Sequence, residues 1–142
     1  MNNQYFNANY AYPSFQTYRD NSYEREGRFV IADEGFAKGN LDRTLYKPYR
    51  NYQVKNPIAN TDKDKLLLKI QKNGFAMQEI GMYLDVYPED AEAIKAFTYY
   101  RIEEEKLTNE YERKYGPLSL ASLSNDVYPY AWVKCPWPWE GR

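Results

Sequence analysis

The tryptophans of this chain are concentrated near its C-terminal end, where they could bind another surface. Trp132, Trp137 and Trp139 lie within eight residues of one another. Pro136 and Pro138 interleave with the indoles, and proline fixes φ near −65° while favouring an extended residue before it. The end of the chain is therefore expected to be a stiff strip of large aromatic faces. Such faces dominate interface energetics, so we interpret the strip either as an anchor for a partner or as a lid on the chain's own core.

Residues that could catalyse a reaction form no recognisable set. The chain has no histidine, which removes the commonest general acid–base group and the usual metal ligand. Glu79, Asp85 and Glu104 are available acids, but no nucleophile or metal-ligand pattern accompanies them. The acidic run at 103–105 would point around a helix rather than towards one ion. We expect no enzyme, no catalytic residues and no metal or cofactor.

The single Cys135 cannot form a disulfide within the chain. It is expected to be either an unreactive small apolar residue or the source of an intermolecular disulfide in a late, oxidising assembly.

The composition favours contact with other proteins over contact with nucleic acid or lipid. The chain has 16 Tyr, 6 Phe and 3 Trp, but a net charge of only −1 and no basic cluster. Nucleic acid would require such a cluster, and no apolar run approaches the roughly 20 residues of a membrane span. The first residues show no signal peptide. We expect a soluble protein that is made in the cytoplasm of its cell.

A long helix is predicted over residues 62–86. Thr61 and Asp64 have the spacing of a capping box, in which each side chain meets an unpaired backbone N–H of the first turn. Residues at intervals of four and three then form one face, which is the pattern of a buried helix side: Leu66, Ile70, Asn73, Met77, Ile80 and Leu84. Gly74 and Gly81 lie beside this face and suggest the close approach of another backbone. Asn73 would either fix the register or simply mark the boundary of the face.

A second helix is predicted over residues 88–115. Pro88 suits the first helical position, and Gly116 with Pro117 ends the helix. Its expected buried face comprises Ala93, Ile94, Phe97, Tyr100, Leu107, Tyr111 and Tyr115. The predicted fold class is all-α, an antiparallel two-helix hairpin with irregular, aromatic-rich arms at both ends. Two helices make a marginal core, so the chain's own tail, a second copy or another protein should cover the hairpin.

Three regions are predicted along the chain. Residues 1–28 are rich in Asn and Tyr without a period, which is typical of a disordered tail. Residues 29–60 form a short docking segment and linker, in which Phe36, Leu41, Leu45 and Tyr49 provide the apolar contacts. Residues 61–142 form the helical hairpin with its Trp/Pro tail.

Residues 62–141 resemble the CotJB family of spore coat proteins. The resemblance is carried by Tyr83-Leu84-Asp85-Val86-Tyr87-Pro88-Glu89-Asp90, by Tyr115-Gly116-Pro117-Leu118 and by Pro136-Trp137-Pro138-Trp139-Glu140. Residues 34–49 are similar to the core of the companion coat protein family CotJA, through Gly35-Phe36-Ala37-Lys38-Gly39 and Leu45-Tyr46-Lys47-Pro48-Tyr49. Asn40 stands where that family commonly has Thr.

The resemblance implies a non-catalytic assembly or adaptor protein of the inner spore coat, made in the mother cell during sporulation. Its implied partners are other coat proteins, among them a manganese-catalase-like (CotJC-type) protein. The candidate partner-binding residues are Tyr46, Pro48, Tyr49, Tyr115, Gly116, Pro117, Trp132, Pro136, Trp137, Pro138, Trp139 and Glu140. The alternative is a self-associating structural component that is cross-linked through tyrosines such as Tyr5, Tyr10, Tyr12, Tyr18 and Tyr23.

Overall fold

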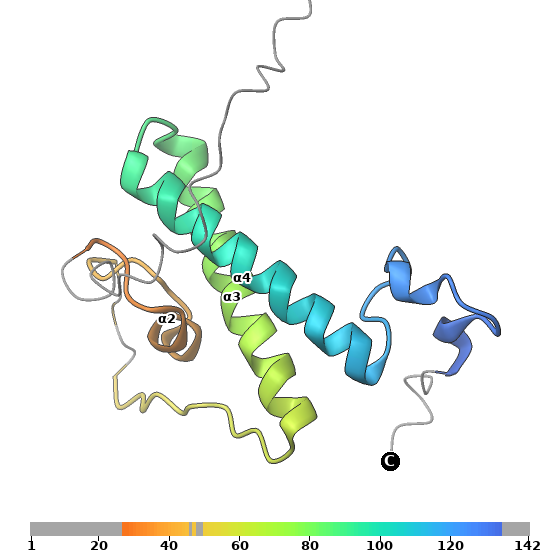
Figure 1. Ribbon diagram of the computed structural model, residues 1–142. Helices are drawn as coiled ribbons and strands as arrows, with labels where there is room; N and C mark the ends of the chain where they lie inside the picture. Colours follow the sequence, from red (N-terminus) through yellow and green to blue (C-terminus); the bar gives the residue numbers. More distant parts are fainter. Residues whose placement is uncertain (1–26, 46, 48–49, 135–142) are drawn as a thin grey trace, which may run out of the picture.

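The computed structural model describes residues 27–45, 47 and 50–134 (Figure 1). Its helices are α2 (Ala32–Lys38), α3 (Asp62–Val86) and α4 (Ala91–Tyr115), followed by the short 3-10 helices η2 (Leu123–Asn125) and η3 (Ala131–Lys134). Phe29 and Asp42 form an isolated antiparallel bridge, and the described residues contain no named β-strand. The predicted all-α class and the pair of long packed helices are confirmed. The predicted tail at 1–28 lies almost wholly outside the described residues.

Helix α3 has the predicted bounds because its first turn is capped as expected. The side chain of Thr61 accepts a hydrogen bond from the backbone N–H of Asp64 at 3.1 Å, and the Asp64 carboxylate accepts from the Thr61 N–H at 3.2 Å. This reciprocal capping box satisfies two N–H groups that have no partner inside the helix. The helix ends at Val86, where Tyr87 takes the cap position.

Helix α4 begins at Ala91, three residues later than predicted. Asp90 is its N-cap, and one oxygen of its carboxylate accepts from the N–H groups of Glu92 and Ala93, both at 3.0 Å. The Asp90 side chain can accept hydrogen bonds from these N–H groups, and proline has no side-chain acceptor. The helix therefore starts after Asp90, and Pro88 lies in the turn before it. At the other end Gly116, with φ 106°, caps the helix as predicted.

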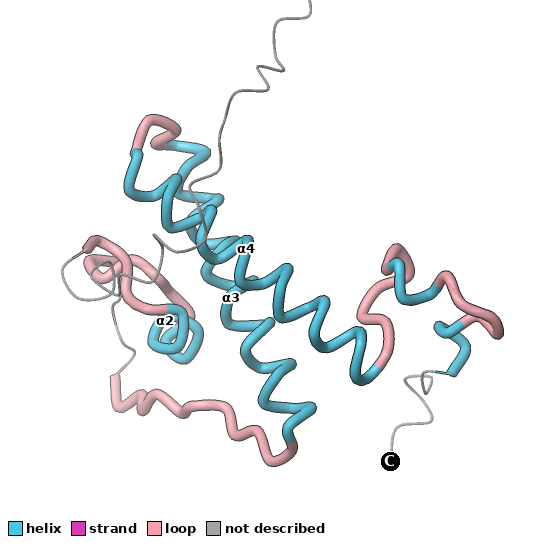
Figure 2. Tube along the Cα trace, viewed as in Figure 1, coloured by secondary structure: helices cyan, strands magenta, loops and turns pink. Residues whose placement is uncertain are grey.

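The two long helices run antiparallel and pack against each other (Figures 1 and 2). Ala76 of α3 and Ala93 of α4 have no exposed surface, and Ile80 is also fully buried. The predicted role of the glycines was wrong. A Cβ at Gly74 would meet nothing within 4 Å, and one at Gly81 would meet the Phe97 ring at 3.5 Å rather than a backbone.

The predicted buried faces are only partly right. Ile70, Ile80, Ala93 and Tyr111 are buried as expected. Ile94 and Tyr115, however, are 44% and 40% exposed. Asn73 plays no part between helices, because its amide nitrogen donates to the Lys69 carbonyl of its own helix at 2.8 Å.

The core also contains residues from before the hairpin. We call residues 28–45 the strap. Val30, Ala32 and Leu41 of the strap are buried in one cluster with Ala76, Ile80 and Ala93 of the hairpin. Figure 1 shows the strap, with α2, lying against one side of α3. Residues 50–60 then lead as a loop to the start of α3 (Figure 2). The strap therefore covers part of the hairpin, whereas the covers expected from the sequence were the chain's own tail, a second copy or another protein.

Candidate protein-interaction site

Two surfaces decide what this chain can bind: the strap's junction with the hairpin and the segment that follows α4. We call that segment, residues 117–134, the C-terminal arm. The first surface is satisfied within the chain and the second is not. Their difference rests on burial and hydrogen bonds.

The strap is closed by its own hydrogen bonds. The Val30 N–H donates to the Leu41 carbonyl at 2.9 Å, and the Arg43 N–H donates to the Arg28 carbonyl at 3.1 Å. Gly39, with φ 77°, ends α2 and turns the chain back, and its N–H donates to the Gly35 carbonyl. Only glycine adopts this left-handed conformation at no cost. The two ends of the strap are therefore joined by hydrogen bonds within the strap itself.

An arginine joins the strap to the hairpin. The Arg28 Nε donates to the Asp42 carboxylate at 2.6 Å, and the guanidinium carbon lies 4.7 Å from the centre of the Tyr83 ring on α3. The Tyr83 hydroxyl donates in turn to the Asp90 carboxylate at 2.9 Å. Phe29 adds an edge-to-face contact with the Tyr83 ring at 5.3 Å. This cation–aromatic cluster connects the strap, α3 and the cap of α4.

The charges of this cluster shift the pKa values of its members. Burial raises the pKa of Asp42, but hydrogen bonds from Thr44 and Arg28 outweigh burial, so the pKa lies below its usual value. The pKa of Asp90 is lowered by the hydrogen bond from the Ala93 N–H and then by that from Tyr83. Both carboxylates are therefore held in the charged form.

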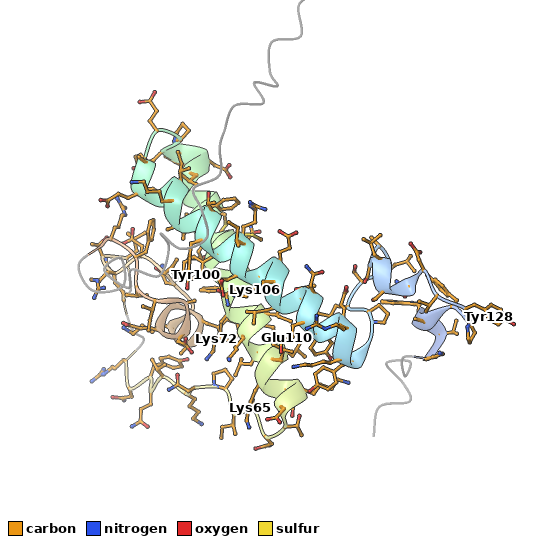
Figure 3. All side chains as sticks on the ribbon, in the orientation of Figure 1. Lys65, Lys72, Tyr100, Lys106, Glu110 and Tyr128 are labelled. Atoms are coloured by element: carbon orange, nitrogen blue, oxygen red, sulfur yellow. The ribbon has the colours of Figure 1, made fainter. Side chains whose placement is uncertain are left out.

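Further contacts between strap and hairpin are few. Asp33 of the strap forms an ion pair with Lys72 of α3, whose position beside α2 is labelled in Figure 3. The Phe36 and Phe75 rings meet edge to face at 5.7 Å. The Leu41 N–H donates to the Glu79 carboxylate at 3.4 Å. Glu79, one of the acids considered for catalysis, therefore holds the strap.

The C-terminal arm is attached to α4 through one glutamate. The Glu112 carboxylate accepts from the Leu118 N–H at 3.0 Å and from the Ser122 hydroxyl at 2.5 Å. Asn125 closes the arm on itself by donating to the carbonyls of Ser119 and Leu120, both at 3.0 Å. The base of the arm therefore has a defined shape.

The arm exposes much of its apolar surface. Its exposed large apolar residues are Leu118, Leu120, Leu123, Val127, Tyr128, Tyr130 and Val133. Leu123 is 85% exposed and Tyr128 completely so. In Figure 3, Tyr128 points away from the rest of the protein at the far end of the arm. Exposed apolar side chains that gather into one surface mark interaction sites, so the arm is a candidate for one.

The predicted binding residues fall into two groups. Trp132 is half-buried in η3, Pro117 is buried, and Gly116 caps α4. Tyr115 is exposed, with its ring 5.2 Å from that of Tyr111. The others lie outside the described residues: Tyr46, Pro48, Tyr49, Pro136, Trp137, Pro138, Trp139 and Glu140. The exposed apolar residues of the arm were not among the predicted binding residues, although their spacing among Ser, Asn and Pro could have indicated them.

The acids on α4 do not converge. Glu103 pairs with Lys106, Glu105 pairs with Arg101, and Glu104 accepts from Thr108, each along the surface of one helix. Within the described ranges, no three residues of the His, Cys, Asp and Glu types lie close enough together to hold a metal ion. None of the helices described is long and apolar enough to cross a membrane.

Comparison with known proteins gives one match. A family model described as CotJB protein matches residues 64–140, which is just over half of the chain. The matched region contains α3 except its first two residues, all of α4 and the whole C-terminal arm, and it excludes the strap. No curated protein and no solved structure matches the chain.

Proposed function

Because this chain belongs to the CotJB family of spore coat proteins, we propose that it is a non-catalytic assembly protein that helps to incorporate a manganese-catalase-like protein into the inner spore coat. The hairpin is the platform, and the C-terminal arm with the Trp/Pro tail is the surface that binds the partner. The protein is made in the mother-cell cytoplasm and then enters the coat.

One observation carries this proposal: seven of the 18 residues of the arm are exposed large apolar residues, whereas the 25 residues of α4 include three. Tyr128 is wholly exposed and Leu123 is 85% exposed, while Ile70, Ala76 and Ile80 of α3 are buried. The arm therefore carries a denser run of exposed apolar side chains than α4 does. Aromatic and aliphatic side chains on a polar base are typical anchors of protein–protein interfaces.

The identity of the partner rests on the family resemblance. The CotJA-like and CotJB-like proteins are the small members of a set of three, and the third member resembles a manganese catalase. The two small members are associated with incorporation of that third protein into the coat. The CotJA-like pattern at residues 34–49 supports the same view. A chain that joins both patterns would raise their effective concentration for one another, which is useful only when they act together.

Purification from sporulating cells tests the proposal. The wild-type protein, isolated under native conditions, should bring a manganese-catalase-like protein with it. A variant with Trp137→Ala and Trp139→Ala should lose that protein while it keeps its helical circular dichroism. Tyr52→Ala, which removes an aromatic side chain exposed in the linker, is the matched control and should retain it. Retention by the tryptophan variant would contradict the tail's role.

Self-association through tyrosines is the second candidate, and the exposed Tyr128 favours it. Tyr128 and Tyr130 are both exposed on the arm, at 100% and 44%. If the arm serves cross-linking, peptides from purified coats should contain dityrosine at these positions. Recovery of only unmodified, extractable monomer would count against it.

A further inference from the structure

We propose that the strap can leave its own hairpin and occupy the same place on a second copy of this chain, linking copies by reciprocal exchange. The proposal concerns residues 28–45 and the hairpin face that they cover. It does not depend on the manganese-catalase-like partner, because that partner is assigned to the arm at the other end of the hairpin.

The strap has the properties of a separate unit. Its two ends are joined by backbone hydrogen bonds at Val30–Leu41 and Arg43–Arg28, and by the Arg28–Asp42 ion pair. These bonds lie within the strap, so they persist when it moves as a whole. Exchange therefore does not require the strap to unfold.

The strap's bonds to the hairpin are independent of which copy supplies it. They include the buried cluster of Val30 and Leu41 with Ile80, the Phe36–Phe75 ring contact, the Asp33–Lys72 ion pair and the contact of Arg28 with the Tyr83 ring. None of them involves the linker. A strap from a second copy would make the same contacts, so the exchanged and unexchanged forms have nearly equal interface energies.

The linker permits the exchange. Residues 46–60 connect the strap to α3, and residues 47, 50–58 and 60 are exposed. Fifteen residues can span about 50 Å when extended, whereas the 25 residues of α3 are about 37 Å long. The strap can thus reach a neighbouring hairpin without displacing packed structure.

Concentration sets the balance between the two forms. A linker of fifteen residues keeps a strap near its own hairpin at an effective concentration on the order of millimolar. Dilute protein should therefore be monomeric. Exchange becomes competitive when the chain itself is at millimolar concentration, as in a packed assembly.

Reciprocal charge reversal of Asp33 and Lys72 provides the test in the full-length chain. Chain one carries Asp33→Lys and chain two carries Lys72→Asp. Each chain alone then has like charges at its junction, both in the monomer and in an exchanged homodimer. In a mixture, both junctions of an exchanged heterodimer regain opposite charges. The negative control is a mixture of wild type with the double variant Asp33→Lys/Lys72→Asp, in which the monomers are matched and the exchanged heterodimer is mismatched.

Native mass spectrometry of mass-labelled chains at 0.1–1 mM gives the readout (a range chosen about the millimolar effective concentration). We expect about tenfold more heterodimer in the first mixture than in the control mixture, since two exposed ion pairs are gained in one and lost in the other. Circular dichroism of each variant checks that its helices are retained. Equal heterodimer yields in the two mixtures, or monomers throughout, would overturn the proposal.

Discussion

The guanidinium of Arg28 lies 4.7 Å above the ring of Tyr83, a residue 55 positions later in the chain. Arg28 belongs to the strap and Tyr83 to α3, so this contact joins two segments that the linker separates in the sequence. Asp42 accepts a hydrogen bond from the Arg28 guanidinium, and Asp90 accepts one from the Tyr83 hydroxyl. Through these groups the strap, α3 and the N-cap of α4 form one connected unit, and several consequences can be measured.

Removal of Arg28 should loosen the strap. In Arg28→Ala, the nearly buried Asp42 loses its ion-pair partner and the Tyr83 ring loses its cation. We expect a lower thermal midpoint and faster proteolysis within residues 28–45. Arg43→Ala, at an exposed position of the same strap, is the control. Equal midpoints for the two variants would show that the cluster does not hold the strap.

Truncation of Leu41 should be costly because this side chain is 1% exposed. Leu41→Ala is expected to lower the free energy of unfolding by about 2–5 kcal/mol, the usual range for a buried leucine. Urea denaturation followed by circular dichroism measures the change. Leu45→Ala is the matched control, because Leu45 is 62% exposed and its loss should cost less than about 0.5 kcal/mol. Similar losses for both leucines would contradict the burial of the strap.

Two glycine-to-alanine changes should have opposite signs. A Cβ at Gly35 would lie 2.5 Å from the Leu41 Cδ1 and 3.3 Å from its Cα, so Gly35→Ala should overpack the strap and cost about 1–3 kcal/mol. A Cβ at Gly74 would meet nothing within 4 Å, so Gly74→Ala should stabilise α3 by up to about 1 kcal/mol. Thermal unfolding of both variants gives the comparison. Stabilisation by Gly35→Ala would mean that the strap is not tightly packed.

Acid should remove the stability that Asp42 and Asp90 contribute to the folded protein. The pKa values of Asp42 and Asp90 are lowered in the folded protein from an ordinary value of 3.8. A lowered pKa contributes stability that is fully present above the ordinary value and lost as the pH falls through the folded value. The free energy of unfolding should therefore fall between about pH 5 and pH 2.

Asn substitutions separate this effect from that of other carboxylates. The pKa of Glu110 is also lowered, by its hydrogen bond with Lys114, so some acid dependence persists without the cluster. A variant with Asp42→Asn and Asp90→Asn should show a shallower slope in urea titrations over the same pH range. An unchanged slope would place the acid sensitivity elsewhere.

The sequence predicted the long helices well because their signals are local. The capping box of Thr61 and Asp64, and the stop at Gly116, act within one turn of the chain. The predicted start of α4 was wrong because Pro88 and Asp90 are both helix-start signals. The helix begins after Asp90, whose side chain caps it. The residues that cover the hairpin could not be predicted from such local signals. Burial of Val30 and Ala32 depends on contacts with α3 and α4 that have no periodic pattern in the strap.

Aromatic binding at the C-terminal end of the chain stays a prediction from the sequence. Trp132, one of its residues, lies half-buried in η3. It did not indicate Leu123 or Tyr128, because exposure depends on what the fold leaves uncovered rather than on residue type. Equally, nothing local revealed that Glu79 holds the strap rather than serving as a free acid.

We expect the C-terminal arm to bind the partner and the hairpin not to bind it. Two variants test this expectation, each with the same number of exposed apolar residues changed to serine. The arm variant combines Leu120→Ser, Leu123→Ser and Tyr128→Ser. The control variant, at the turn end of the hairpin, combines Met82→Ser, Val86→Ser and Ile94→Ser.

Calorimetric titration of each purified variant with the purified manganese-catalase-like coat protein is the most direct measurement. Hot-spot side chains each contribute a kilocalorie per mole or more, so the arm variant should bind at least about 100-fold more weakly than wild type, with unchanged helicity. The control variant should bind as wild type does. Wild-type affinity in the arm variant, or loss of binding only in the control, would contradict the account.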